Sequence, residues 1–149
     1  MSTFIRKEAD YALRIAVYLA GTGSRVKMQD LCLNLGLTRP VVAKVVQDLK
    51  RHHIITSRTG RHGGLSLAAS PENLSVYDVL AAMNSNSSLN TCLDDPQFCR
   101  LQAICRISDF LCQLQQEFFE RLRQVPLSDL VFDELQLSTL VQHHATKNA

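Results

Sequence analysis

Apolar residues recur at helical spacing through the first fifty residues, and they predict three helices separated by short breaks. A broad apolar face runs over Glu8–Ala20, and the glycines within residues 21–24 end that helix. A short second helix is expected over Met28–Leu35, where Gly36 breaks it. A third helix is expected over about Arg39–Arg51.

The third helix carries both a start signal and a core-facing stripe. Thr38 is a good N-cap residue, and Pro40 falls in the first turn, where its missing N–H costs little. Its apolar positions at i, i+3, i+4 and i+7 are Val42, Val45, Val46 and Leu49. We expect these four side chains to face the core.

After residue 53 the chain takes on the features of β-strands. Ile54–Arg58 is rich in β-branched residues, Leu65–Ala68 is a returning strand, and the glycine-containing turn 59–64 joins them into a hairpin. Ser75 is expected to cap a fourth helix that reaches about Met83, and Asn84–Asn90 is a polar loop. Three helices followed by a glycine-tipped hairpin are the order of a winged helix-turn-helix domain.

The C-terminal part is expected to be dominated by one long helix, from about Arg100 to Arg123, which Pro126 stops. A last short helix is expected over Ser128–Leu137, before a frayed tail. The apolar face of the long helix includes Leu101, Ile104, Phe110, Leu111, Leu114, Phe118 and Leu122. The fold class predicted for the chain is therefore mostly α.

The composition is that of a globular protein and gives no sign of a membrane protein. The 149 residues are 46% hydrophobic and 20% charged, which are globular values. No apolar run approaches the roughly 18–20 residues of a membrane span. The segment Met1–Glu8 lacks the apolar core of a signal peptide, so we expect a cytoplasmic protein with no membrane partner.

The two halves of the chain differ in charge. Residues 1–70 hold 11 Lys/Arg and 4 Asp/Glu, a net charge of +7, whereas residues 71–149 hold 5 and 10, a net charge of −5. A basic first half favours a polyanion partner, and a helix of this kind enters the major groove of DNA. The candidate DNA contacts are Arg39, Lys44, Gln47, Lys50 and Arg51 on the third helix and Arg58, Arg61, His62, Gly63 and Gly64 on the hairpin. Each alone fits a solvated charge or an ordinary turn, but their joint position favours DNA binding.

Five cysteines are present, and three of them lie within fourteen residues. Cys92, Cys99 and Cys105 have the spacing C-x₆-C-x₅-C. Clustered thiolates in a reducing compartment indicate a soft metal or an iron–sulfur cluster, and the spacing fits a zinc site poorly. Cys32 is expected to be a core residue. Cys112 is expected to be a packed helix residue, although the regular spacing leaves it open as a fourth ligand.

Four patches of sequence carry a family resemblance. They are Asp10-Tyr-Ala-Leu-Arg14, Val42-Ala-Lys-Val-Val46, Gly60-Arg-His-Gly-Gly-Leu65 and Leu127-Ser-Asp-Leu-Val131. With them, and with the three cysteines, the chain resembles the Rrf-two (Rrf2) family of bacterial winged-helix regulators from about Phe4 to Val131. The resemblance implies a homodimer whose long helices cross, a cysteine-bound iron–sulfur cluster near the partner's DNA-binding domain, and a palindromic DNA operator.

The resemblance divides the chain into functional segments. Residues 1–83 are the winged helix-turn-helix domain, and residues 84–106, here called the cysteine loop, bind the cluster. Residues 100–137 hold the dimerisation helix and a following short helix, and residues 138–149 are a flexible tail. A 4Fe–4S cluster is expected, with 2Fe–2S as the alternative.

The fourth cluster ligand distinguishes the branches of the family. The branch similar to IscR has a His three residues after the last cysteine, where this chain has Ser108. The branch similar to NsrR uses an Asp on the first helix of the other subunit, which corresponds to Asp10, with Glu8 as a weaker candidate. Asp10 equally fits an early-helix acid favoured by the helix dipole. The spacing between Cys92 and Cys99 approaches that of the branch similar to RirA.

These features together predict a cluster-dependent DNA-binding regulator, a repressor, that senses nitric oxide, iron or redox state. The alternative is a cluster-free winged-helix regulator whose cysteines act as a thiol redox switch. We do not expect an enzyme, since the sequence offers no evident nucleophile with its base.

Overall fold

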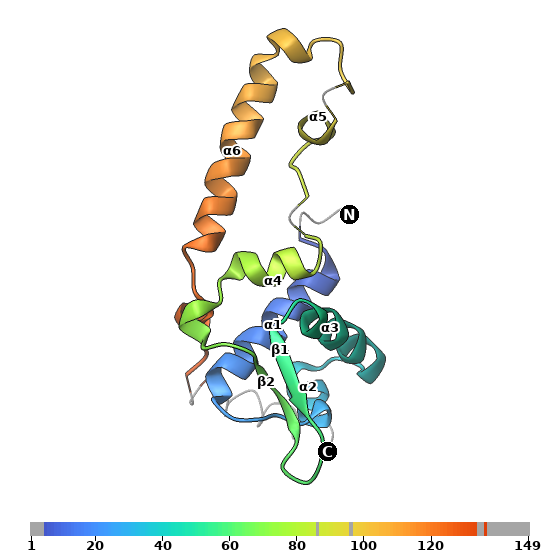
Figure 1. Cartoon of the computed structure of the whole chain (residues 1–149), viewed down its shortest axis with the longest axis vertical. Helices are drawn as coiled ribbons and strands as arrows, with labels where there is room; N and C mark the ends of the chain where they lie inside the picture. Colours follow the sequence, from blue (N-terminus) through green and yellow to red (C-terminus); the bar gives the residue numbers. More distant parts are fainter. Residues whose placement is uncertain (1–4, 86, 96, 134–135, 137–149) are drawn as a thin grey trace.

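The structure is a computed structural model that describes residues 5–85, 87–95, 97–133 and 136 (Figure 1). A winged domain forms one end of the molecule, and one long helix rises from it. The elements are α1 (Lys7–Thr22), α2 (Met28–Leu35), α3 (Arg39–Arg51), β1 (Ile55–Arg58), β2 (Gly64–Leu67), η1 (Pro71–Asn73), α4 (Val76–Ala82), α5 (Thr91–Asp94), η2 (Gln102–Ile104), α6 (Arg106–Arg123) and η3 (Leu127–Leu130).

The core of the winged domain is built around α1, which packs against α3, α4 and the hairpin. Strands β1 and β2 are antiparallel, and their register runs from Ile55 opposite Leu67 to Arg58 opposite Gly64. The main chain of Val26 forms a bridge with Leu65, which ties the hairpin to the segment before α2. The predicted stripe of α3 is confirmed, because Val42, Val45, Val46 and Leu49 are all buried.

The chain returns to the winged domain at the foot of α6. The N–H of Val76 donates to the carbonyl of Val125 at 3.0 Å, and the N–H of Leu127 donates to the carbonyl of Leu74 at 2.8 Å. The Leu127 side chain is fully buried and belongs to the same core. Residues 84–124 therefore leave the winged domain after α4 and come back to it beside the start of α4.

The cap at Ser75 is confirmed, whereas the predicted cap at Thr38 has no side-chain bond. Ser75 forms a capping box with Asp78, in which its hydroxyl accepts from the Asp78 N–H and the Asp78 carboxylate accepts from the Ser75 N–H. Thr38 occupies the N-cap position of α3, but its side chain makes no capping hydrogen bond. The start of α3 is therefore marked by the extended backbone of Thr38 and by Pro40 in the first turn, and a capping side chain does not contribute.

The prediction that the long helix begins at Arg100 is wrong. Helix α6 begins at Arg106, and the six residues before it form turns and η2. Leu101 and Ile104, which we assigned to the apolar face of that helix, are 60% and 80% exposed. Since no described residue covers these side chains, burial does not favour a helix there. The described residues between Asn90 and Cys105 instead form the one-turn helix α5, short turns and η2.

The described residues cover two further expectations at the C-terminal end only in part. Within the short helix expected over 128–137, the residues up to Leu130 belong to the 3-10 turn η3 and Gln136 is helical, whereas residues 134, 135 and 137 lie outside the described residues. The tail 138–149 lies outside the described residues. None of the helices in the described part of the chain has the length and apolarity needed to cross a bilayer.

Candidate functional site

The solvent side of α3 carries the side chains predicted to contact DNA. Arg39, Lys44, Gln47, Lys50 and Arg51 are all exposed, opposite the four buried residues of the same helix. The Arg51 guanidinium pairs with the Asp48 carboxylate at 3.1 Å. An exposed pair of this kind is weak, so Arg51 remains available to a phosphate. Helix α3 thus offers four cationic side chains and one amide to a ligand.

The turn of the hairpin is so tight that two of its glycines have no room for a side chain. A Cβ on Gly63 would meet the carbonyl carbon of Thr59 at 2.8 Å and the carbonyl oxygen of Gly60 at 2.9 Å. Gly64 has φ +143°, and a Cβ there would lie 2.8 Å from the carbonyl oxygen of Val26. Both glycines, which we named as DNA contacts, thus have a clear structural role in the turn. Arg58, Arg61 and His62 are exposed around that turn.

Helix α3 and the wing are brought together at a shared hollow. This hollow, about 290 Å³ in volume, is lined by Gln47 and Lys50 of α3, by Ser57 of β1 and by apolar side chains beneath them. Two of the predicted contact residues therefore flank the space between the two elements that read DNA in a winged helix. A ligand that entered this hollow would lie against both α3 and the strands of the hairpin.

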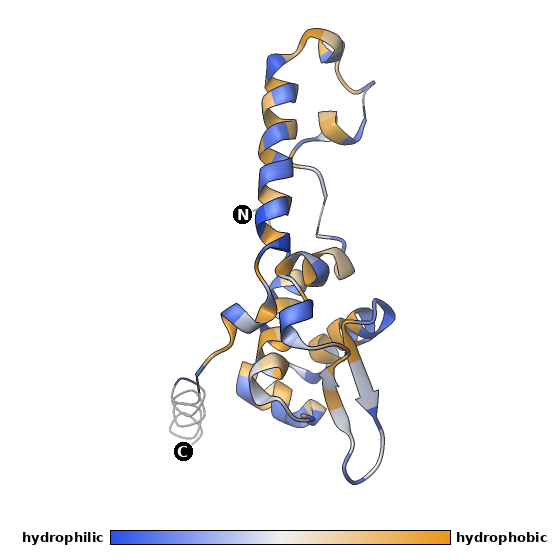
Figure 2. Cartoon of the chain, turned by 60° about the vertical axis from the view of Figure 1, so that its left-hand side comes forward, coloured by the Kyte–Doolittle hydropathy of each residue, from blue (hydrophilic) through white to orange (hydrophobic). Residues whose placement is uncertain are grey.

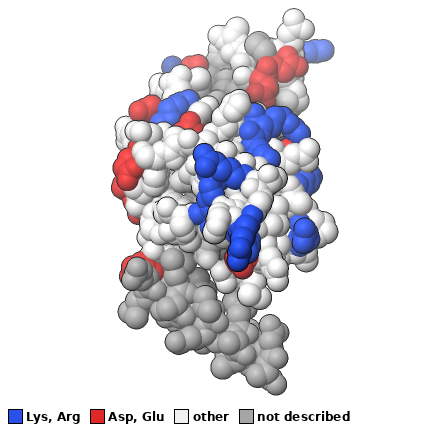
Figure 3. Space-filling model, turned by 60° about the horizontal axis from the view of Figure 1, so that its bottom comes forward, with Lys and Arg blue, Asp and Glu red and all other residues white. Residues whose placement is uncertain are grey.

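Sequence reasoning missed two basic residues beside the wing. Arg25 lies in the segment before α2, and its guanidinium donates to the carbonyl of Gly64 at 3.5 Å. Lys27 is the N-cap residue of α2 and is exposed. Figure 3 shows Lys and Arg side chains gathered on this end of the molecule. In the sequence these two residues contributed only to the net positive charge of residues 1–70.

The cysteine loop places its three cysteines at successive turns. Cys92 lies in α5, Cys99 in the turn that follows, and Cys105 at the N-cap of α6. All three are half-buried and free of disulfides, as are Cys32 and Cys112. Within the described residues no group of three or more His, Cys, Asp or Glu side chains is arranged to hold a metal ion. The loop thus gathers the cysteines along the chain without arranging them as a three-ligand site among the described residues.

The other two cysteines lie outside this loop. Cys32 packs against the core of the winged domain, as expected. Cys112 is on α6, and the Gln116 side-chain nitrogen lies 3.9 Å from its sulfur. The expectation for Cys32 is thus confirmed, whereas Cys112 is a half-buried residue of α6.

The acidic candidates lie on the first helix. The carboxylate of Asp10 pairs with the Arg14 guanidinium at 2.9 Å, and their side chains are 44% and 58% exposed. Glu8 is also exposed. Ser108, which stands where a His ligand occurs in one branch of the family, is buried in α6 at 7% exposure. Its hydroxyl lies 3.4 Å from the Gln102 amide nitrogen.

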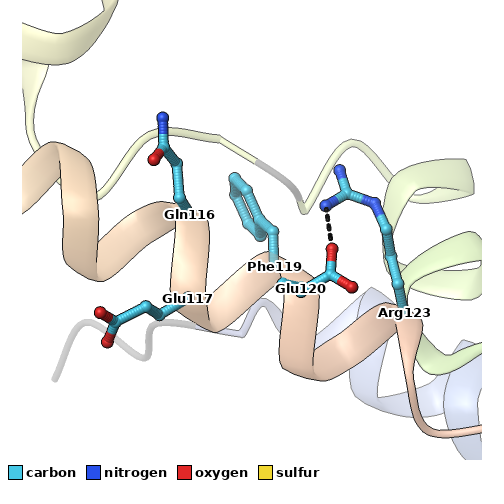
Figure 4. Close-up of a pocket in the computed structure, with 5 residues that line it drawn as sticks. All are labelled: Gln116, Glu117, Phe119, Glu120 and Arg123. Atoms are coloured by element: carbon cyan, nitrogen blue, oxygen red, sulfur yellow. Dashed lines mark ion pairs between the residues drawn. The ribbon is translucent and has the colours of Figure 1, made fainter.

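A second hollow, of about 520 Å³, lies along the lower part of α6 (Figure 4). Its lining includes Phe119 and the ion pair between Glu120 and Arg123 at 3.8 Å. The Arg123 guanidinium stacks 4.1 Å above the ring of Tyr77 from α4, and Phe119 meets that ring edge-on. This cluster anchors α6 on α4.

Comparison with known proteins gives consistent results. Residues 5–133 match the family model Rrf2, described as "Iron-dependent Transcriptional regulator". Solved structures with the same fold include CymR (YrzC), the global cysteine regulator of B. subtilis, with a TM-score of 0.72 at 17% identity over 87% of this chain and 96% of that chain. IscR of T. potens has a TM-score of 0.68 at 16% identity, covering 87% and 85%. CymR of Staphylococcus aureus has a TM-score of 0.67 at 16% identity, covering 86% and 98%.

Proposed function

The chain belongs to the Rrf2 family of iron-dependent transcriptional regulators, and from this premise we propose that it is a homodimeric repressor whose DNA affinity depends on an iron–sulfur cluster. The observation that carries the proposal is the combination of a basic winged surface with a loop of three free cysteines in one chain. The winged surface binds the operator, and the cysteine loop senses nitric oxide, iron or redox state.

The winged domain supports DNA binding by its charge and its shape. Exposed cations of α3 and of the wing neutralise phosphates, and Gln47 can read the edge of a base. The wing brings Arg61 and His62 to its tip, where an Arg fits a narrow minor groove. Two such domains related by a two-fold axis recognise a palindromic operator.

The donor chemistry of the cysteine loop fits an iron–sulfur cluster. Its thiols are free and half-buried, and thiolates are the ligands that such clusters take. The amide oxygen of Gln102, within the same loop, is buried without a hydrogen-bond partner in the described structure, so the chain alone does not satisfy the loop's polar groups. Cys92, Cys99 and Cys105 would hold the cluster, 4Fe–4S or else 2Fe–2S. A bound cluster supplies iron that reacts with nitric oxide or oxygen and is lost when iron is scarce.

Asp10 of the other protomer is our candidate for the fourth ligand. Its carboxylate lies on the solvent side of α1, and its pairing with Arg14 is an exposed ion pair of small free energy. A second protomer can therefore take over this carboxylate at little cost. A carboxylate is a hard ligand for iron and is displaced readily, which suits a sensor.

The test is to purify the protein without oxygen and to measure iron, acid-labile sulfide and DNA affinity with and without the cluster. Iron and sulfide in near-equal amounts, and DNA affinity that falls on cluster loss, are expected. Cys92→Ala, Cys99→Ala and Cys105→Ala should bleach the protein, and Asp10→Ala should weaken cluster retention. Cys32→Ala is the matched control that keeps the cluster, and Cys112→Ala tests whether Cys112 is the fourth ligand instead. Equal DNA affinity of the two forms would overturn the proposal.

A thiol redox switch without a cluster is the second candidate. It is favoured by the five free cysteines and by the finding that the described residues form no three-ligand group for a metal ion. It expects colourless protein even without oxygen, together with reversible disulfide formation that changes DNA affinity. Mass spectrometry of the oxidised protein identifies the pair of cysteines.

A further inference from the structure

Gln102 makes hydrogen bonds to the main chain of all three cysteines of the loop. Its N–H donates to the carbonyl of Cys99 at 3.1 Å, and its carbonyl accepts from the N–H of Cys105 at 3.5 Å. These two bonds are local turn bonds that any residue can make. Its side-chain Nε2 also donates to the carbonyl of Cys92 at 3.1 Å, across ten residues of chain. Only this last link depends on the side chain being glutamine.

The orientation of the Gln102 amide is set by its partners. The carbonyl of Cys92 only accepts, so the amide nitrogen must face it. The same nitrogen lies 3.4 Å from the hydroxyl of the buried Ser108, which gives the amide a second anchor on α6. Oε1 is then left buried without a partner among the described residues. A buried acceptor without a donor costs about 1–3 kcal/mol, a penalty that an apolar side chain at this position avoids. Stability of the chain alone does not account for glutamine here.

We propose that Gln102 is a positioning residue that ties the turn of Cys92 to the turn of Cys99 and Cys105. The three thiols form no metal-binding group in the described structure, and this link keeps their turns together so that a metal ion can draw the thiols to one centre. The inference rests on the function proposed above and deepens it, since it names the side chain that organises the ligand set. Hydrogen bonds behind metal ligands orient them, and their loss typically weakens metal affinity about 10–100-fold.

The experiment is an anaerobic titration of the reduced, metal-free full-length protein with cobalt(II), followed by the thiolate-to-cobalt charge-transfer absorption. Gln102→Leu removes the donor, and Gln102→Glu keeps the size but presents only acceptors to the Cys92 carbonyl. Both are expected to bind cobalt(II) about 10–100-fold more weakly than the wild type. Their absorbance per cobalt should fall by about a third, to that of Cys92→Ser, because one thiolate of three is lost. Gln97→Leu, an exposed glutamine in the same loop, is the matched control and should behave as wild type.

Wild-type affinity and absorbance in both Gln102 variants would overturn the inference, and so would a wild-type protein without cobalt–thiolate absorption. The winged domain should unfold at the same temperature in every variant, because residues 84–106 contribute no buried apolar side chain in the described structure. If Gln102→Leu does not fold, Gln102→Glu decides. Failure of the proposed function gives a different result, namely DNA affinity that is independent of the cluster while cobalt binding still depends on Gln102.

Discussion

At Gly64 the wing approaches the segment before α2 so closely that no side chain fits. Gly64→Ala combines a strained φ of +143° with a contact of 2.8 Å to the carbonyl oxygen of Val26. We expect it to lower the free energy of unfolding by about 2–3 kcal/mol, measured by urea denaturation. Gly60→Ala is the matched control, because its φ is also positive but its Cβ meets nothing within 4 Å. Equal losses in the two variants would contradict a role for the close contact.

Of the four cations on α3, Arg51 is paired with Asp48, whereas the ion pairs between described residues include neither Lys44 nor the other two. If Lys44 contacts a phosphate, Lys44→Ala should reduce the slope of log K against log salt by about 0.9. Fluorescence anisotropy with a DNA duplex of arbitrary sequence measures this slope. Arg121→Ala, an exposed cation on α6, is the control and should leave the slope unchanged.

At the scale of elements, sequence predicted α2 and α3 to the residue because their boundaries are set locally. Gly36 takes a left-handed conformation at φ +64° and ends α2, and Pro40 marks the first turn of α3. The start of α6 was not predictable in this way. It depends on contacts across the cysteine loop, such as the bond from Gln102 to Cys92, that no short-range pattern contains.

The candidate site was predictable to a similar extent. The cations of α3 follow from the helical period, because they lie opposite a stripe of buried valines. Arg25 was missed because only the folded chain brings it to the carbonyl of Gly64. Asp10 was a candidate through the family resemblance, and in the described chain its carboxylate pairs with Arg14.

The 3-10 turn η3 is a small element that attaches the end of α6 to the core of the winged domain. Leu127 is fully buried in the winged core, while Leu130 of the same turn is 43% exposed. Leu127→Ala should cost about 2–5 kcal/mol of unfolding free energy. Leu130→Ala should cost less than about 1 kcal/mol. Thermal and urea unfolding followed by circular dichroism compare the two, and similar losses would show that η3 is not a core element.

At the scale of the whole molecule, the buried apolar side chains of the described structure lie in residues 9–83 and at Leu127. Helix α6 displays apolar and polar residues along its length (Figure 2). On this helix Ile107 is 69% exposed and Phe110 is 62% exposed. An apolar surface of this kind on one helix is typical of a site that a protein partner covers. A second copy of the chain is the partner that our proposal requires.

Ile107→Arg combined with Phe110→Arg should convert the dimer into a monomer at micromolar protein concentration, because two charges would be buried in the interface. Analytical ultracentrifugation measures the change. Gln116→Arg, an exposed residue on the opposite side of α6 at about 100° per residue, adds the same kind of charge and should leave the dimer intact. A dimer that persists in the double variant would place the interface elsewhere.

Because the chain returns to α4, residues 84–124 form a long insertion whose two ends are both fixed to the winged domain. The entropy of closing such a loop depends only weakly on its length, since doubling the length costs about 0.6 kcal/mol. Insertions and deletions between the cysteines are therefore nearly neutral for the domain that carries the basic surface. Evolution can change the spacing of the sensing residues without having to rebuild the part of the protein that reads DNA.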